Sequence, residues 1–232
     1  MRKTLAVCSK QIKDTWRNKS VLIQFALLPI LALIMGYLMP EEVGAGPTLA
    51  PMFTTMYVGM VPLSCMTAII AEEREKGTLR SLRMANVTGG QYLLGIGSCL
   101  FVESLFGISL FAILGGYTGA ALAEHFMISM LGVLVSLMLG STVGLLAKNQ
   151  MSATSLSTPI AVVLSFVPTL ATLNDSMAKV SRFLYTQQLQ NMMQSIGNDP
   201  FTWKQLGIVG ANLAVFCLLF LVIYKKKGLR DQ

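Results

Sequence analysis

The stretch Ala71-Glu72-Glu73-Arg74-Glu75-Lys76-Gly77-Thr78-Leu79-Arg80-Ser81-Leu82-Arg83 is a dense run of charges between two long apolar segments, residues 52–71 and 93–115. Each apolar segment has roughly the 20 residues that a helix needs to cross about 30 Å of hydrocarbon. Charged side chains are costly inside hydrocarbon, so the run between the two segments must lie outside it. The alternation predicts two membrane-spanning helices joined at one side of a membrane.

The composition of the whole chain agrees with this interpretation. The chain is 53% hydrophobic and 12% charged, with a mean hydropathy of +0.62, which leaves too few polar residues to cover a soluble globule. The apolar runs are continuous, as in helices, and do not alternate as in a barrel. We therefore expect an all-α membrane protein that forms a single domain over residues 1–232. Six windows can span: 21–39, 52–71, 93–115, 126–147, 154–173 and 208–224.

The basic residues predict the orientation. With the N-terminus in the cytoplasm, only Lys179, Arg182 and Lys204 of the 18 lysines and arginines fall outside. The positive-inside rule therefore favours a multi-pass protein of the cell membrane with both termini in the cytoplasm. The net charge of +7 reflects this topology and contact with anionic membrane lipids, and it is no evidence for binding nucleic acid.

The N-terminal segment, residues 1–19, has apolar residues at helical spacing. Leu5, Cys8, Ile12 and Trp16 recur every three or four residues among basic ones. The spacing predicts an amphipathic helix lying at the inner membrane interface. The alternative is a solvated basic leader that only sets the orientation.

A second segment without a spanning window, residues 174–204, precedes the sixth span. Its apolar residues are spaced as on short helices that are too polar to cross, among them Met177, Val180 and Leu184. We expect short outer helices here, which either dip into the outer leaflet or lie on the surface.

Within the charged run, Glu72 and Lys76 are four residues apart with the acid first, the favourable order for a pair on a helix. Gly77 is expected to interrupt that helix, and Thr78 can cap a second short one. The second helix would present two leucines beside two arginines, a knob that suits a cleft in a partner protein. The alternative is a solvated, salt-bridged loop. The knob residues are Leu79, Leu82, Arg80 and Arg83.

The run Glu-Glu-Arg-Glu-Lys-Gly-Thr-Leu-Arg-Ser-Leu, after the second of six spans and before Gln91-Tyr92-Leu93-Leu94-Gly95, resembles the signature of ABC-2 type transporter permeases. The N-terminal helix and the long outer segment are also similar to that family, so the resemblance covers essentially the whole chain. Where many relatives have a proline shortly after the motif, this chain has Asn86-Val87-Thr88-Gly89-Gly90.

The resemblance implies the permease subunit of an ATP-driven exporter in a bacterial cell membrane. Such a subunit forms half of the translocation route, pairs with an identical or related second permease, and couples to two copies of a cytoplasmic ABC ATPase through residues 72–92. Its cargo would be amphiphilic or hydrophobic, such as a peptide, a drug or a lipid. The coupling residues would be Glu72, Glu73, Arg74, Glu75, Lys76, Gly77, Thr78, Leu79, Arg80, Leu82 and Arg83.

The chain lacks the residues of an enzyme or a metal site. It contains no Gly-x-x-x-x-Gly-Lys-Ser/Thr phosphate loop, so ATP and Mg²⁺ would be bound by the partner ATPase and no cofactor by this chain. No catalytic constellation stands out, and the four cysteines lack the spacing of a zinc site. The alternative function is that of a secondary transporter or a helical scaffold, although the two halves show no inverted repeat.

Polar and small residues inside the spans point to a route and to helix packing. Glu103 lies near the middle of the third span, where it would line the route, pair with another group or stay neutral in a hydrogen bond. Gly132, Ser136, Gly140 and Gly144 form a ridge of small residues, which favours packing within the chain. Family resemblance places the first, second and fifth spans along the route, with Gln24, Thr54, Thr55, Tyr57 and Ser157 as lining candidates.

Overall fold

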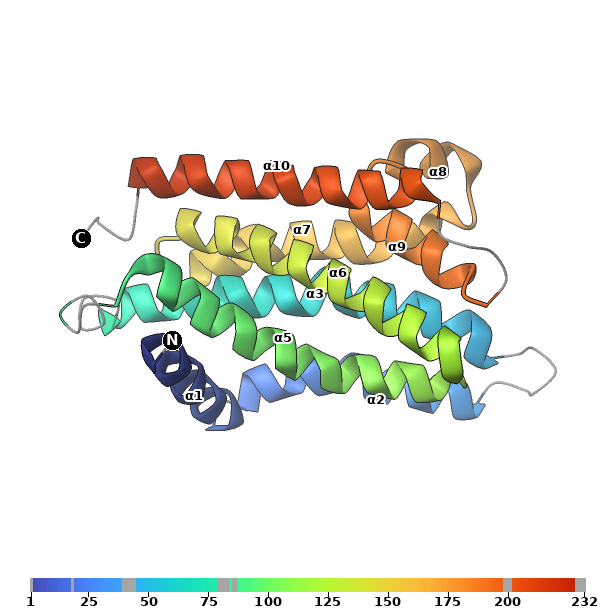
Figure 1. Ribbon diagram of the computed structural model, residues 1–232, viewed down its shortest axis with the longest axis horizontal. Helices are drawn as coiled ribbons and strands as arrows, with labels where there is room; N and C mark the ends of the chain where they lie inside the picture. Colours follow the sequence, from blue (N-terminus) through green and yellow to red (C-terminus); the bar gives the residue numbers. More distant parts are fainter. Residues whose placement is uncertain are drawn as a thin grey trace.

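Six long helices make up the body of the protein (Figure 1). The computed structural model describes residues 2–17, 19–38, 45–78, 84, 87–197 and 202–227. All six helices are long and apolar enough to cross a membrane, and the described residues contain no strand. The predicted fold class is therefore confirmed. The long helices are α2 (Lys19–Leu38), α3 (Ala45–Glu75), α5 (Gly89–Leu114), α6 (Gly119–Leu146), α7 (Gln150–Ala171) and α10 (Trp203–Lys227).

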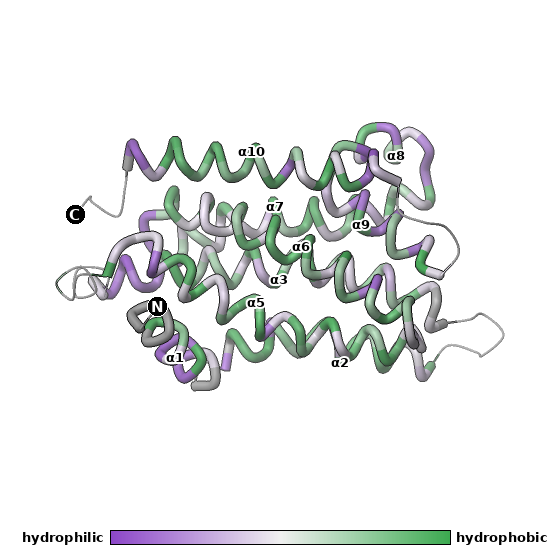
Figure 2. The backbone as a smooth tube through the Cα atoms, in the orientation of Figure 1, coloured by the Kyte–Doolittle hydropathy of each residue, from purple (hydrophilic) through white to green (hydrophobic). Residues whose placement is uncertain are grey.

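Three shorter helices lie at the two ends of this bundle. Helix α1 (Arg2–Arg17) lies at an angle to the long helices at one end and packs against α5. Helices α8 (Asp175–Ser181) and α9 (Tyr185–Gln194) join α7 to α10 near the opposite end. Successive long helices alternate in direction, so the end that holds α1 also holds the C-terminal ends of α3 and α10. Figure 2 shows hydrophilic residues gathered at the two ends and apolar residues along the middle.

The helices extend beyond the apolar windows of the sequence. Helix α6 begins at Gly119, although its window begins at residue 126, and α5 begins at Gly89. The start of α5 is fixed by a capping box: Gln91 N donates to Thr88 Oγ1 at 3.3 Å, and Thr88 N donates to Gln91 Oε1 at 3.1 Å. Helix formation therefore continues past the apolar segments, because the backbone needs no hydrocarbon to hold its hydrogen bonds.

Helix α3 is the central helix and packs against α2, α5, α6, α7 and α9. Its closest neighbour is the ridge of small residues on α6. A Cβ atom on Gly140 would lie 2.6 Å from the backbone oxygen of Leu63, so only glycine permits this approach. Ser136 Oγ donates to the carbonyl of Val58 at 2.6 Å in the same contact. The ridge thus faces another helix of the same chain.

Helix α9 is buried in the bundle. Tyr185, Leu189, Met192 and Met193 are each at most 1% exposed and lie among α3, α6, α7 and α10. The hydroxyls of Tyr185 and Ser136 are 2.8 Å apart, which ties α9 to the contact between α3 and α6. The segment before the last span is thus partly built into the helical core, while most of α8 is exposed and only Ser181 of that helix is buried.

Candidate functional site

The charged run begins as the last turn of α3 and not as a separate loop. The helix continues past Ala71 to Glu75, and Gly77 follows with a φ of 67°, a left-handed conformation that glycine adopts without strain. Thr78 Oγ1 donates to the Glu73 carbonyl at 3.3 Å, which satisfies one of the free carbonyls at the end of α3. The predicted knob residues Leu79, Arg80, Leu82 and Arg83 lie outside the described residues.

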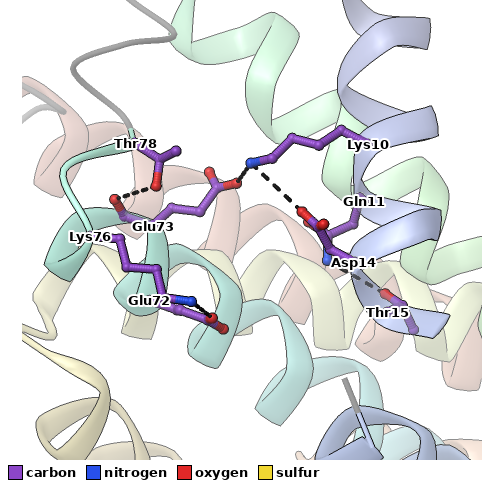
Figure 3. A network of polar contacts seen from close by, with 8 residues as sticks. All are labelled: Lys10, Gln11, Asp14, Thr15, Glu72, Glu73, Lys76 and Thr78. Atoms are coloured by element: carbon purple, nitrogen blue, oxygen red, sulfur yellow. Dashed lines mark hydrogen bonds and ion pairs between the residues drawn. The ribbon is translucent and has the colours of Figure 1, made fainter. Parts of the chain in front are cut away.

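Glu73 connects this last turn to α1. Its side chain is directed toward α1, and its Oε1 lies 2.6 Å from Lys10 Nζ (Figure 3). Glu73 as a whole residue is 8% exposed, so the pair is partly shielded from water. Lys10 also lies 3.9 Å from Asp14 on its own helix. A shielded ion pair of this kind holds two helices in one relative position, because breaking it leaves a charge without compensation.

Arg74 connects the same turn to the end of α6. Its Nη1 donates to the carbonyls of Leu145 at 3.2 Å and Ala147 at 2.6 Å. These carbonyls belong to the C-terminal end of α6, where the helix dipole favours a positive charge. One guanidinium thus satisfies carbonyl groups that the helix itself cannot.

Glu75 connects the turn to the beginning of α7. Its Oε2 accepts a hydrogen bond of 2.9 Å from the backbone N–H of Gln150, the first residue of that helix. The negative charge therefore lies at a helix N-terminus, the favourable end for an anion. Asn149 Oδ1 caps the same helix by accepting from Ser152 N at 2.9 Å.

The predicted pair of Glu72 and Lys76 is present on the outer side of the turn. The hydrogen bond to Glu72, together with its negative charge, raises the pKa of Lys76. Residues 72 and 76 thus pair with each other within the turn, whereas the three residues 73–75 contact α1, α6 and α7. We call these three residues, with their partners on the three helices, the α3 junction.

A polar cavity of about 540 Å³ lies beside the α3 junction, between α1 and the end of α3. Figure 3 shows the Glu73–Lys10 contact and the Glu72–Lys76 pair around it. The charged side chains in its wall are balanced in sign, with three basic and three acidic residues, so the cavity does not select ions of one charge. They are Lys10, Lys19, Lys76, Asp14, Glu72 and Glu73.

The predicted N-terminal segment forms the helix α1, which packs against the bundle through a partly polar face; that its apolar residues lie at the membrane interface stays a prediction. Val7, Gln11 and Thr15 are buried, whereas Ile12 is exposed. The buried face is therefore partly polar, and Gln11 Nε2 contacts Thr15 Oγ1 at 3.5 Å within it. Lys10, Gln11 and Thr15 were missed as site residues by the sequence reasoning. The only sequence signal was the spacing of four residues between Gln11 and Thr15, which places both on one face of a helix.

The residues predicted to line a route do not share one surface. Thr54, Thr55, Tyr57 and Ser157 are all buried inside the helical core. Gln24 is exposed and accepts from Cys65 Sγ at 3.1 Å, and Glu103 is half-buried on α5. In this structure the buried four would reach a route only after the helices separate, and their role stays a prediction. Among the residues that the structure describes, none form a cluster of three or more ligands that could hold a metal ion.

The sequence comparison assigns the chain to a transporter family. No curated protein matches the chain. The family model described as ABC-2 type transporter matches residues 2–196. This range contains five of the six long helices, α1, the α3 junction and the buried helix α9. The protein, a membrane-embedded transport subunit with six long apolar helices, therefore belongs to the ABC-2 type transporter family.

Proposed function

We propose that the chain is the permease subunit of an ATP-driven exporter in a bacterial cell membrane. It pairs with a second permease, identical or related, and works with two copies of a separate cytoplasmic ATPase that bind ATP and Mg²⁺. The cargo is amphiphilic or hydrophobic. Membership of the ABC-2 family supports the class, and the α3 junction supports the way in which force reaches the helices.

The observation that carries the mechanism is that three consecutive residues contact three different helices. Glu73 binds Lys10 on α1, Arg74 binds the end of α6, and Glu75 binds the start of α7. The segment 76–83 follows directly and is the part that we expect the ATPase to contact. A displacement of that segment on ATP binding would therefore move α1, α3, α6 and α7 together and change access to the route.

The first experiment tests the class. The full chain, tagged and expressed in its own host, is purified in mild detergent, and co-eluting proteins are identified. A stoichiometric ATPase with a phosphate loop is the expected result. Elution of the chain without any ATPase, while its own helical spectrum is native, would contradict the proposal.

The second experiment tests the α3 junction in the purified complex. Arg74→Met removes the two bonds to α6, and Lys148→Met removes an exposed positive charge from the neighbouring α6–α7 turn. Because the outer pair of Glu72 and Lys76 is intact, both variants should retain the ATPase. We expect Arg74→Met to lower the ATP hydrolysis of the reconstituted complex at least threefold and Lys148→Met to leave it unchanged. Equal rates in the two variants would refute the role of the junction without affecting the class.

A further inference from the structure

Glu103 lies in a second cavity, which is separate from the α3 junction. This cavity has a volume of about 350 Å³ and lies among α1, α2 and α5. Five residues line it beside the carboxylate, and four of these are apolar. The complete lining is Thr15, Leu22, Phe25, Ala26, Glu103 and Phe106.

The carboxylate of Glu103 lacks a strong partner in this cavity. Oε1 accepts from the thiol of Cys99 at 3.4 Å, which is a weak donor, and the uncharged hydroxyl of Thr15 lies in the wall of the same cavity. Oε2 is buried and has no hydrogen-bond partner among the described residues. No positively charged side chain is present among the described residues that line the cavity. A half-buried carboxylate within a membrane span loses part of its hydration, so a positive charge placed beside it would be attracted.

Two aromatic rings complete the chemistry of the cavity. Phe25 is buried against the core, and Phe106 is 64% exposed on the outer side of α5. Aromatic faces attract cations and also supply apolar contact area, as they do around quaternary ammonium groups. The exposure of Phe106 means that the cavity opens sideways, toward the space that lipid occupies around a membrane helix. A ligand dissolved in the membrane can therefore enter without crossing the α3 junction.

We propose that this cavity binds a lipophilic organic cation, with its charge beside Glu103 and its apolar groups against Phe25 and Phe106. A neutral hydrophobic molecule would leave the carboxylate uncompensated, and an anion would be repelled by it. A small hydrated metal ion would find one carboxylate and no further charged ligand among the described lining residues. The proposed binding does not depend on the proposed transport function. Only the further step, that the bound cation is cargo, rests on that function.

The test measures binding to the purified full chain in lipid nanodiscs without ATP, so that a missing ATPase cannot affect the result. Radiolabelled tetraphenylphosphonium is the probe, and tetraphenylborate, with the same shape and the opposite charge, is the competitor. We expect saturable binding that tetraphenylborate does not displace. Glu103→Gln should weaken it at least tenfold, and Phe106→Leu about threefold. Glu124→Gln, which alters a carboxylate on α6 that accepts from Gly197 N, should leave it unchanged.

A second measurement uses the unaltered chain, so it does not depend on the folding of a variant. Dicyclohexylcarbodiimide modifies carboxyl groups in apolar surroundings, and mass spectrometry locates the product. Tetraphenylphosphonium should protect Glu103 from modification, and tetraphenylborate should not. Absence of saturable binding, equal binding by Glu103→Gln, or no protection at saturating probe would each overturn the proposal.

Discussion

Helices α3 and α10 both have the length and composition of membrane spans, yet they occupy opposite environments. In α3, 83% of the residues in the apolar window are buried inside the protein, whereas in α10 the share is 6%. The buried helix is the more polar of the two and contains Thr54, Thr55 and Thr67, as well as two prolines in its interior. The exposed helix is almost purely aliphatic along its outer side, with Leu218, Leu219 and Leu221.

The difference shows that apolar character alone does not decide which helix is central. Lipid tails solvate leucine as well as the protein interior does, so burying aliphatic groups gains little free energy in a membrane. Close backbone contact and hydrogen bonds between helices decide instead. Helix α3 makes both with α6, while α10 makes contact mainly with α6 and α9 along one side.

The largest effect is expected where the backbones of α3 and α6 touch. Gly140→Leu places side-chain atoms against the backbone oxygen of Leu63, which cannot move aside, and should destabilise the fold by at least about 3 kcal/mol. Gly210→Leu on α10 meets no atom within 4 Å and is the matched control. Size-exclusion profiles after detergent extraction should show aggregated Gly140→Leu and monodisperse Gly210→Leu. Two monodisperse profiles would mean that the helices separate easily.

A smaller effect is expected from removing the same side chain at the two sites. Leu63 on α3 is fully buried, and Leu219 on α10 is 46% exposed. Leu63→Ala leaves a cavity and should cost about 3 kcal/mol, while lipid can fill the space left by Leu219→Ala at a cost below about 1 kcal/mol. Thermal unfolding in micelles gives both values. Similar losses at the two sites would place α10 inside an interface in the assembled protein.

The smallest effects are expected from single hydrogen bonds. Ser136→Ala leaves the hydroxyl of Tyr185 without its partner and should cost about 1.5 kcal/mol. Asn212 on α10 donates from Nδ2 to the carbonyl of Phe183, in the turn between α8 and α9, at 2.9 Å, and Asn212→Ala should cost about 0.6 kcal/mol, the typical value of a side-chain hydrogen bond in a membrane protein. Chemical unfolding curves resolve this difference. A larger loss for Asn212→Ala would reverse the ranking of the two helices.

The number and approximate position of the spans could be predicted from the sequence, because hydrocarbon thickness alone requires apolar runs of that length. The helix ends could be predicted only in part. Gly77 was expected to interrupt a helix through residues 72–76, and α3 ends at Glu75, but the partners of residues 73–75 on α1, α6 and α7 were not predicted. Those partners lie about 60 to 75 residues away in the chain, and no local spacing indicates them.

The site could be predicted only where its contacts are local in the sequence. The pair of Glu72 and Lys76 is local, and its spacing was sufficient. The position of Glu103 within a span marked it as unusual. Its cavity is also lined by α1 and α2, and nothing in the sequence indicated that these helices lie beside α5. The apolar spacing of α1 predicted an interfacial helix, but it did not indicate that Gln11 and Thr15 would be buried against the bundle.

The α3 junction also constrains the length of α3, so that even one inserted residue would disrupt its contacts. Successive side chains on a helix point about 100° apart, so each of the three contacts has its own direction. One extra residue inserted before Glu72 would place Glu73 against the carbonyls at the end of α6 and Arg74 against the N–H groups at the start of α7. Both charges would then face the wrong pole of a helix dipole. The helical register of this turn is therefore as constrained as the identity of its residues.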